Sequence, residues 1–211
     1  MVKRKSTEAL NGDANRPAKS QRESPRKTTK SVKSTTASTT PIQENLVSKN
    51  EAYGKSFTKG HLALPPAKHY AIVTCMDARI DPAAAYGIDL GDAHVIRNAG
   101  GSAIDALRSL VISQQLLGTK EILLIKHTGC GMLTFDTETA TGIVEKNLGD
   151  AGLKELKRFV GGEGKFQDFP DLEKAVESDV ALLNESKLIP DEVVISGWVY
   201  EVETGKVRRV V

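Results

Sequence analysis

Two short motifs of chemically reactive residues stand out in this sequence of 211 residues. Cys75, Asp77 and Arg79 occupy alternate positions, and His127 is separated by two residues from Cys130, the only other cysteine of the chain. Two thiolates and one imidazole are good zinc ligands. Three protein ligands leave the fourth tetrahedral position open to water, as in catalytic zinc sites. The motifs therefore predict a catalytic zinc site bound by Cys75, His127 and Cys130.

Two other interpretations of the cysteines remain open at this point. Cys75 and Cys130 could form a disulfide, although a reducing compartment and the nearby His127 argue against one. They could also be two independent buried thiols, because free cysteine is among the residues most often buried. The spacing alone is compatible with all three interpretations, so the placement of the motifs in the fold decides among them.

Asp77 and Arg79 are spaced as a pair beside the first cysteine. Residues two apart in an extended chain point to the same side, and an arginine can hold a carboxylate through two parallel hydrogen bonds. A free Asp77 could itself bind zinc and fill the open position, whereas an Asp77 held by Arg79 leaves that position to water. The alternative is an incidental surface pair, which contributes little.

Strands and helices must bring the two motifs together. Buried strands are expected over 69–74, 93–97, 121–126 and 192–200. The first of these ends at Cys75 and the third at His127. Functional sites in open α/β sheets gather at the carboxyl ends of the strands. We therefore expect the two motifs to lie side by side on neighbouring strands.

The elements between the strands indicate the fold class. Helices are expected over 43–58, 81–87, 102–117, 136–160 and 170–185. Strands that alternate with helices predict an α/β fold, with a mostly parallel central sheet flanked by helices. A Thr204-Gly205 turn before a short strand at 207–210 adds a C-terminal antiparallel edge hairpin. In the helix over 102–117, Ile104, Leu107 and Val111 are expected to share one face, with Ala103, Ala106 and Leu110 beside them.

The chain divides by composition at about residue 41. Residues 1–41 carry ten Lys/Arg and three Asp/Glu, a net charge of +7, and they are rich in Ser and Thr. Such a segment buries too little apolar surface to offset its ordering entropy, so we expect a disordered basic tail. Residues 42–211 carry the other 19 basic and 24 acidic residues, a net charge of −5. We expect them to form one zinc-binding domain.

The tail also bears on partners and location. Basic clusters at Lys3–Lys5 and at Arg22, Arg26 and Lys27 could serve as a nuclear address or as a weak nucleic-acid contact, whereas a solvated tail is the simpler interpretation. The sequence shows no membrane-spanning run of about 20 apolar residues and no secretory signal. Two cysteines also predict a reducing compartment. We expect a cytoplasmic protein with access to the nucleus as the alternative.

The motifs together resemble those of the β-class carbonic anhydrases. The resemblance extends over about residues 43–211 and rests on four segments: Cys75-x-Asp77-x-Arg79, Arg97-Asn98-Ala99-Gly100-Gly101, His127-x-x-Cys130, and Gly197-x-x-Tyr200 with Thr204-Gly205. Met76, Ala78 and the short chain are more similar to the compact subclass than to the plant-type one.

The resemblance implies a zinc lyase that hydrates carbon dioxide reversibly to bicarbonate and a proton through a zinc-bound hydroxide. It implies Zn²⁺ as the cofactor and a homodimer as the assembly. Asp77 would then orient the hydroxide, and Arg79 would keep Asp77 off the metal. The backbone amides of Gly100 and Gly101 could approach the substrate closely, because no Cβ intervenes.

Two alternative functions remain. The first is hydrolysis of carbonyl sulfide or carbon disulfide on the same scaffold, since these are also small linear molecules that a zinc hydroxide could attack. The second is a catalytically idle zinc-binding protein whose tail contacts nucleic acid; the Asp77–Arg79 pair argues against it. Among residues outside the motifs, Asp105 is a candidate to orient His127, and His94 is expected to be structural.

Overall fold

A computed structural model describes residues 38–160 and 165–211 of the chain. The chain divides into two units, Met1–Lys55 and Ser56–Val211. Except for residues 38–41, the predicted disordered tail lies outside the described residues and stays a prediction. Helix α1, Pro41–Ser56, corresponds to the helix expected over 43–58. Thr40 and Gln43 cap its start by exchanging side-chain to backbone hydrogen bonds of 2.8 and 3.3 Å, as in a capping box.

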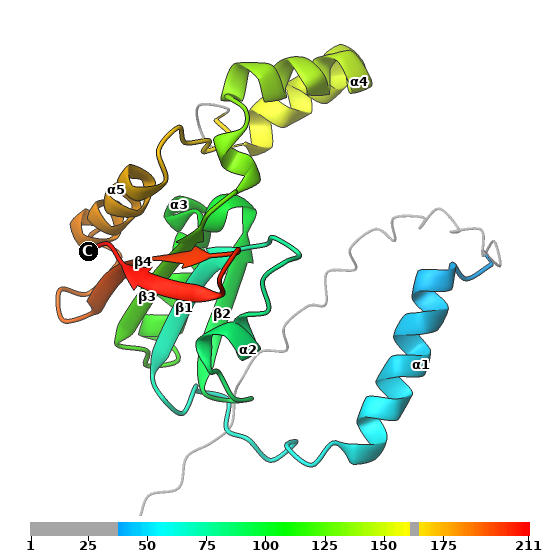
Figure 1. Ribbon diagram of the computed structural model, residues 1–211, viewed down its shortest axis with the longest axis vertical. Helices are drawn as coiled ribbons and strands as arrows, with labels where there is room; N and C mark the ends of the chain where they lie inside the picture. Colours follow the sequence, from blue (N-terminus) through cyan, green and yellow to red (C-terminus); the bar gives the residue numbers. More distant parts are fainter. Residues whose placement is uncertain (1–37, 161–164) are drawn as a thin grey trace, which may run out of the picture. The chain divides into compact units, whose positions relative to one another are not determined.

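The second unit is built on a five-stranded sheet in the order β2-β1-β3-β4-β5 (Figure 1). The strands are β1 Tyr70–Cys75, β2 Ala93–Asn98, β3 Glu121–His127, β4 Val194–Glu201 and β5 Lys206–Arg209. The strands from β2 to β4 are parallel, and β5 pairs with β4 in the antiparallel direction at one edge. The predicted α/β fold with a terminal edge hairpin is confirmed.

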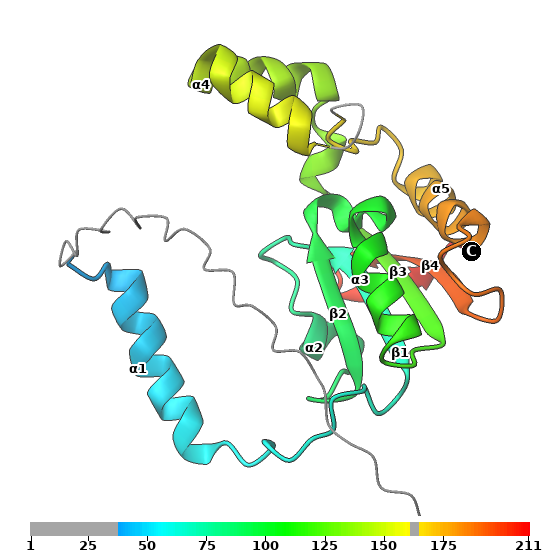
Figure 2. The same ribbon diagram turned by 180° about the vertical axis from the view of Figure 1, so that it is seen from behind.

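Helices cover both faces of this sheet. They are α2 Pro82–Tyr86, α3 Ala103–Gln115 and α5 Leu172–Glu185, whereas α4 Thr137–Phe159 projects away from the sheet (Figure 1). Helices α3 and α5 pack on one face, and the short α2 lies on the other (Figures 1 and 2). The described part of the chain has no helix long and apolar enough to cross a membrane.

The starts and ends of the helices follow from side-chain capping. Ser102 begins α3, as expected, by accepting a hydrogen bond from the amide of Asp105. Gly87 ends α2 with a φ of +64°, which a residue with a side chain adopts only at a cost. Within α4, Gly149 has φ +67° and ψ −170°, so the helix is interrupted there and forms two arms.

The core consists of two apolar clusters, one on each face of the sheet. Alternate residues of β1 and β3 contribute to both, since successive side chains of a strand point to opposite faces. The structure moves the packed face of α3 away from Ile104. Ala103, Ala106 and Leu110 are fully buried, whereas Ile104 is 43% exposed. Small alanines allow α3 to approach the sheet closely, and Ile104 is left on the surface.

Candidate metal centre

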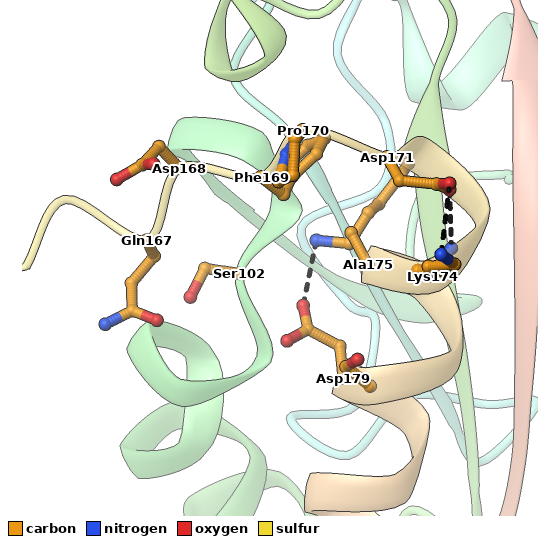
Figure 3. A pocket seen from close by; sticks show the side chains of 11 residues that line it. Ser102, Gln167, Asp168, Phe169, Pro170, Asp171, Lys174, Ala175 and Asp179 are labelled. Carbon is orange, nitrogen blue, oxygen red and sulfur yellow. Dashed lines mark hydrogen bonds and ion pairs between the residues drawn. The ribbon is translucent and has the colours of Figure 1, made fainter. Parts of the chain in front are cut away.

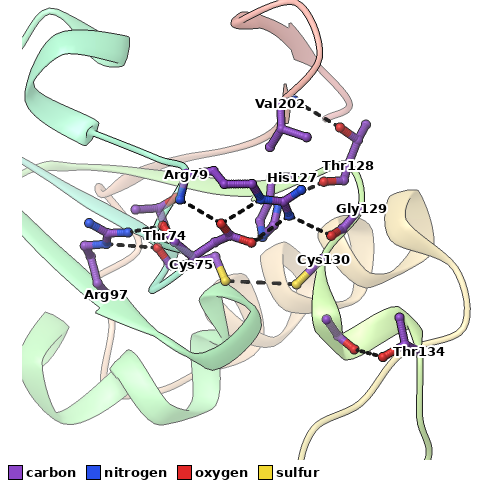
Figure 4. Close-up of polar contacts among 12 residues, drawn as sticks. Thr74, Cys75, Arg79, Arg97, His127, Thr128, Gly129, Cys130, Thr134 and Val202 are labelled. Atoms are coloured by element: carbon purple, nitrogen blue, oxygen red, sulfur yellow. Dashed lines mark hydrogen bonds and ion pairs between the residues drawn. The ribbon is translucent and has the colours of Figure 1, made fainter.

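The carboxyl ends of β1 and β3 bring the two motifs together. These strands are direct neighbours and run parallel. Cys75 is the last residue of β1, His127 is the last of β3, and Cys130 follows in the turn after β3 (Figure 4). Possible ligand atoms of the three residues all lie within 4.8 Å of one another, and all three side chains are buried. The structure thus assembles the predicted Cys-His-Cys group.

The geometry of this group fits a tetrahedral metal ion. The two sulfur atoms are 4.0 Å apart, close to the roughly 3.8 Å between two thiolates on a tetrahedral zinc with Zn–S bonds of about 2.3 Å. Both cysteines are free, so the disulfide interpretation is wrong for this structure. Nε2 of His127 is buried and makes no hydrogen bond to any described residue. An unpaired buried nitrogen facing two thiols is what a zinc site without its metal would contain.

The orientation of His127 is fixed by the backbone. Its Nδ1 donates a hydrogen bond of 2.9 Å to the carbonyl of Thr128, and this leaves Nε2 as the ligand atom. The hydroxyl of Thr128 donates to Glu203 at 2.7 Å and accepts from the amide of Val202 at 3.0 Å. Asp105 was a candidate to orient the ring, but Nδ1 of His127 is bound to the carbonyl of Thr128, which takes the orienting position.

The three candidate ligands change one another's pKa values. The hydrogen bond from Cys130 lowers the pKa of Cys75 to about 4, against the effect of burial, and His127 and the backbone near Gly100 contribute to the lowering. The same contact with Cys75, together with burial, raises the pKa of Cys130. Burial lowers the pKa of His127, but the neighbouring Cys75 outweighs it and the net shift is upward. A dication that binds here must displace the protons of these groups.

Arg79 holds Asp77 beside the ligands. Its Nε and Nη2 donate to the two carboxylate oxygens of Asp77 at 2.9 and 2.7 Å, and its amide donates at 2.9 Å. Nη2 also donates to the carbonyl of Gly129 at 2.9 Å. These contacts hold the pKa of Asp77 well below its usual range. Oδ2 of Asp77 lies 3.7 Å from Nε2 of His127, so the restrained carboxylate borders the position that a metal would occupy.

Arg97 fixes the backbone of the first motif. Its Nε donates to the carbonyl of Cys75 at 2.9 Å, and its Nη2 donates to the carbonyl of Asp77 at 2.7 Å. The amide of Met76 donates to the carbonyl of Asn98 at 2.9 Å. Sequence reasoning used Arg97 only as part of a resemblance. Its position at the end of a strand beside β1 was the signal that could have assigned it this role.

Gly100 and Gly101 form the turn after β2. Both have positive φ, +71° and +59°. A Cβ on Gly101 would lie 3.1 Å from the carbonyl carbon of Thr74 and 3.2 Å from the nitrogen of Cys75, so the turn is pressed against the end of β1. Gly101 is therefore needed for close approach to the protein backbone, whereas a Cβ on Gly100 would meet the side chain of Met132 at 2.8 Å. Their expected contact with substrate stays a prediction.

Comparison with known proteins shows which family this chain resembles. A family model described as carbonic anhydrase matches residues 70–207. β-Carbonic anhydrase 1 of Mycobacterium tuberculosis is 37% identical over 170 residues, which cover 80% of this chain and 98% of that protein. A carbon disulfide hydrolase of Acidithiobacillus thiooxidans is 36% identical over 178 residues, 79% of this chain and 89% of that protein.

Solved structures similar to this chain include carbonic anhydrases as well. A carbonic anhydrase from Glaciozyma antarctica has a TM-score of 0.76 and 48% identity, and covers 82% of this chain and all of that one. One from Streptococcus mutans has a TM-score of 0.72 and 42% identity, over 82% and 99% of the two chains. The matches include the strands that carry the three candidate ligands. The chain belongs to the β-carbonic anhydrase family.

Proposed function

We propose that this protein binds one zinc ion through Cys75, His127 and Cys130 and catalyses the reversible hydration of carbon dioxide to bicarbonate and a proton. The observation that carries the proposal is the restrained Asp77 beside a three-ligand group. Arg79 occupies both oxygens of Asp77, so the fourth metal position is left to a water molecule. A site that only had to hold a structural zinc would use four protein ligands.

The chain's residues would divide the chemistry as follows. Bound zinc would supply Lewis-acid activation of water, which lowers the pKa of that water from 15.7 to about 7 in carbonic anhydrase. Asp77 would accept a hydrogen bond from the attacking water and orient its lone pair toward the substrate carbon. Arg79 would keep Asp77 in this position. Arg97 would hold the backbone that carries both Cys75 and Asp77.

Carbon disulfide is the second candidate substrate, because relatives at 36% and 38% identity are carbon disulfide hydrolases. We favour carbon dioxide because a β-carbonic anhydrase matches over 98% of its length and a solved carbonic anhydrase reaches 48% identity. We expect rapid carbon dioxide hydration in a stopped-flow assay of the zinc-loaded protein, and little sulfide release from carbon disulfide or carbonyl sulfide. Sulfide release at the higher catalytic efficiency would reverse the assignment.

A catalytically idle zinc protein is the third candidate. It gives the Asp77–Arg79 pair no purpose, since only a site with an exchangeable fourth ligand needs the carboxylate held away. The tail that motivates this candidate lies mostly outside the described residues.

We also propose that the protein works in a reducing compartment such as the cytoplasm, because both cysteines are free thiols.

We also propose that the protein is a homodimer. Among the described residues, the outer edge of β2 is unpaired in the sheet, and it borders a groove whose lining includes two partly exposed apolar side chains, Val95 at 40% and Ile112 at 37%. Such an edge is normally covered. Leu183 on α5, by contrast, is fully buried within the subunit and carries no argument for a dimer.

We expect sedimentation of the purified protein to give a dimer mass, and Val95→Asp to shift the equilibrium at least tenfold toward monomer, because a buried unpaired charge is costly. Val207→Asp is the matched control, since Val207 is 47% exposed on β5 at the opposite edge of the sheet. A wild-type monomer at all concentrations would refute the dimer. An unchanged Val95→Asp dimer would exclude this surface.

A further inference from the structure

A buried lysine precedes the histidine ligand on β3. Lys126 is 2% exposed. Its ammonium lies 2.8 Å from Oδ2 of Asp179 on α5 and donates to the carbonyls of Gly100 at 3.1 Å and Gly101 at 3.4 Å. It also lies 4.8 Å from the centre of the Phe169 ring. All three ammonium protons therefore have acceptors, and neither the sequence motifs nor the proposed mechanism uses this residue.

An apolar side chain would fill this position more simply. Removing a charge from water is unfavourable unless the charge is well paired. Asp179 supplies the pairing, and its carboxylate also accepts a hydrogen bond of 3.1 Å from the amide of Ala103. Asp179 and Lys126 line a cavity of about 370 Å³ whose wall includes Ser102 and Lys174 (Figure 3). Besides the carboxylate of Asp179, the ammonium binds the two glycine carbonyls, so it links α5 to the turn that follows β2.

The two carbonyls belong to the turn that determines where Cys75 lies. The turn is in van der Waals contact with the backbone at Thr74 and Cys75, through Gly101. Both of its glycines have positive φ, a conformation that glycine does not favour strongly over others. The turn therefore needs a contact that holds it. Lys126 provides that contact from the strand that also carries His127.

We propose that Lys126, anchored by Asp179, is a positioning residue that holds the Gly100–Gly101 turn against the end of β1 and thereby keeps Cys75 at ligand distance from His127. Lys126 contacts no reacting atom. It connects the two strands that supply the metal ligands, so its loss should loosen the ligand set while the sheet stays intact. This inference rests on the proposed zinc site.

Zinc affinity of the full-length protein, measured by competition with a chromogenic chelator, tests the proposal. We expect Lys126→Met, which keeps an unbranched side chain but removes the ammonium, to bind zinc about 10–100-fold more weakly, as is usual when an outer-shell partner of a ligand is lost. Lys126→Arg should recover part of the loss. Lys174→Met is the matched control: Lys174 lines the same cavity but its side chain is 79% exposed and does not contact the turn.

Cobalt substitution gives a second readout that a merely structural role would not change. We expect the thiolate-to-cobalt charge-transfer and d–d bands of Lys126→Met to shift, because the ligand geometry relaxes, while those of Lys174→Met match the wild type. If Lys126→Met does not fold, Asp179→Asn decides, since it keeps the acceptor for Ala103 but weakens the anchor. We expect it to lose zinc affinity by about half as much on a logarithmic scale.

The failure of this inference is distinguishable from that of the proposed function. A wild type that binds no zinc would refute the proposed function. A wild type that binds zinc, with a folded Lys126→Met, or in its absence Asp179→Asn, of unchanged affinity and cobalt spectrum, would overturn the positioning role alone.

Discussion

Cys130→Ala is expected to abolish both zinc binding and carbon dioxide hydration. Cys130 is one of three buried candidate ligands, and its sulfur lies 4.0 Å from that of Cys75. Alanine leaves two protein ligands, so two of the four tetrahedral positions of a zinc ion would have to be filled by water. Zinc content should fall from about one per chain to near zero, and with it the activation of water that lowers its pKa by about nine units. Metal analysis and stopped-flow hydration measure the two effects.

Cys75→Ala and His127→Ala should behave in the same way. Thr134→Ala is a suitable control for Cys130, because Thr134 lies a few residues further along the same turn and donates only to the carbonyl of Gly131. It should keep its zinc and its rate. Zinc content like that of the wild type in Cys75→Ala or Cys130→Ala would refute the ligand assignment.

The strands and the grouping of the three candidate ligands could be predicted from the sequence because both depend on local pattern. The apolar run at 122–125 marks β3, and reactive residues directly after two strands must meet when those strands pair in parallel. The structure confirms the parallel pairing of β1 with β3 and places Cys75, His127 and Cys130 together. The bidentate contact between Asp77 and Arg79 also follows from a local pattern, because residues two apart in an extended segment lie on the same side.

The contacts that orient the ligands could not be predicted, because they depend on the backbone and on distant elements. The partner of His127 is a carbonyl, that of Thr128, and a carbonyl leaves no trace in the residue types. In the sequence, Lys126 looks like a solvent-exposed charged residue near the end of a strand. Its burial depends on an ion pair with Asp179, which lies 53 positions further along the chain on α5. Ile104 was misplaced because the packed face of α3 is formed by Ala103, Ala106 and Leu110, one position round the helix.

The contact between Arg79 and Asp77 leads to the second large effect. Arg79→Lys keeps the positive charge but loses the planar fork that now holds both carboxylate oxygens at 2.9 and 2.7 Å. Oδ2 of Asp77 is 3.7 Å from the ligand atom of His127, so a small movement would let the carboxylate compete with water for the metal. We expect Arg79→Lys to retain its zinc and lose activity by about 10²–10⁴-fold, the range typical of one positioned acid–base group.

Asp77→Asn separates the two roles of the carboxylate. The amide cannot accept a hydrogen bond through a charged oxygen, so hydration should fall by a similar factor of about 10²–10⁴. The amide is also a poorer zinc ligand, so this variant should not block the fourth position. Its rate should therefore show no recovery at high pH beyond that of the wild type. Zinc content should again be unchanged.

The pH profile distinguishes a blocked site from a lost hydrogen bond. Arg79 holds the pKa of Asp77 below its usual range, and even an unrestrained aspartate, with a pKa near 3.9, is ionised throughout pH 6.5–9. The carboxylate therefore competes for the metal equally across that range, whereas hydroxide in solution increases with pH and competes better. Activity of Arg79→Lys should rise toward pH 9 more steeply than that of the wild type or of Asp77→Asn. Near wild-type rates in both variants across this range would refute the proposal that Arg79 keeps Asp77 off the metal, and would leave the zinc assignment itself unchanged.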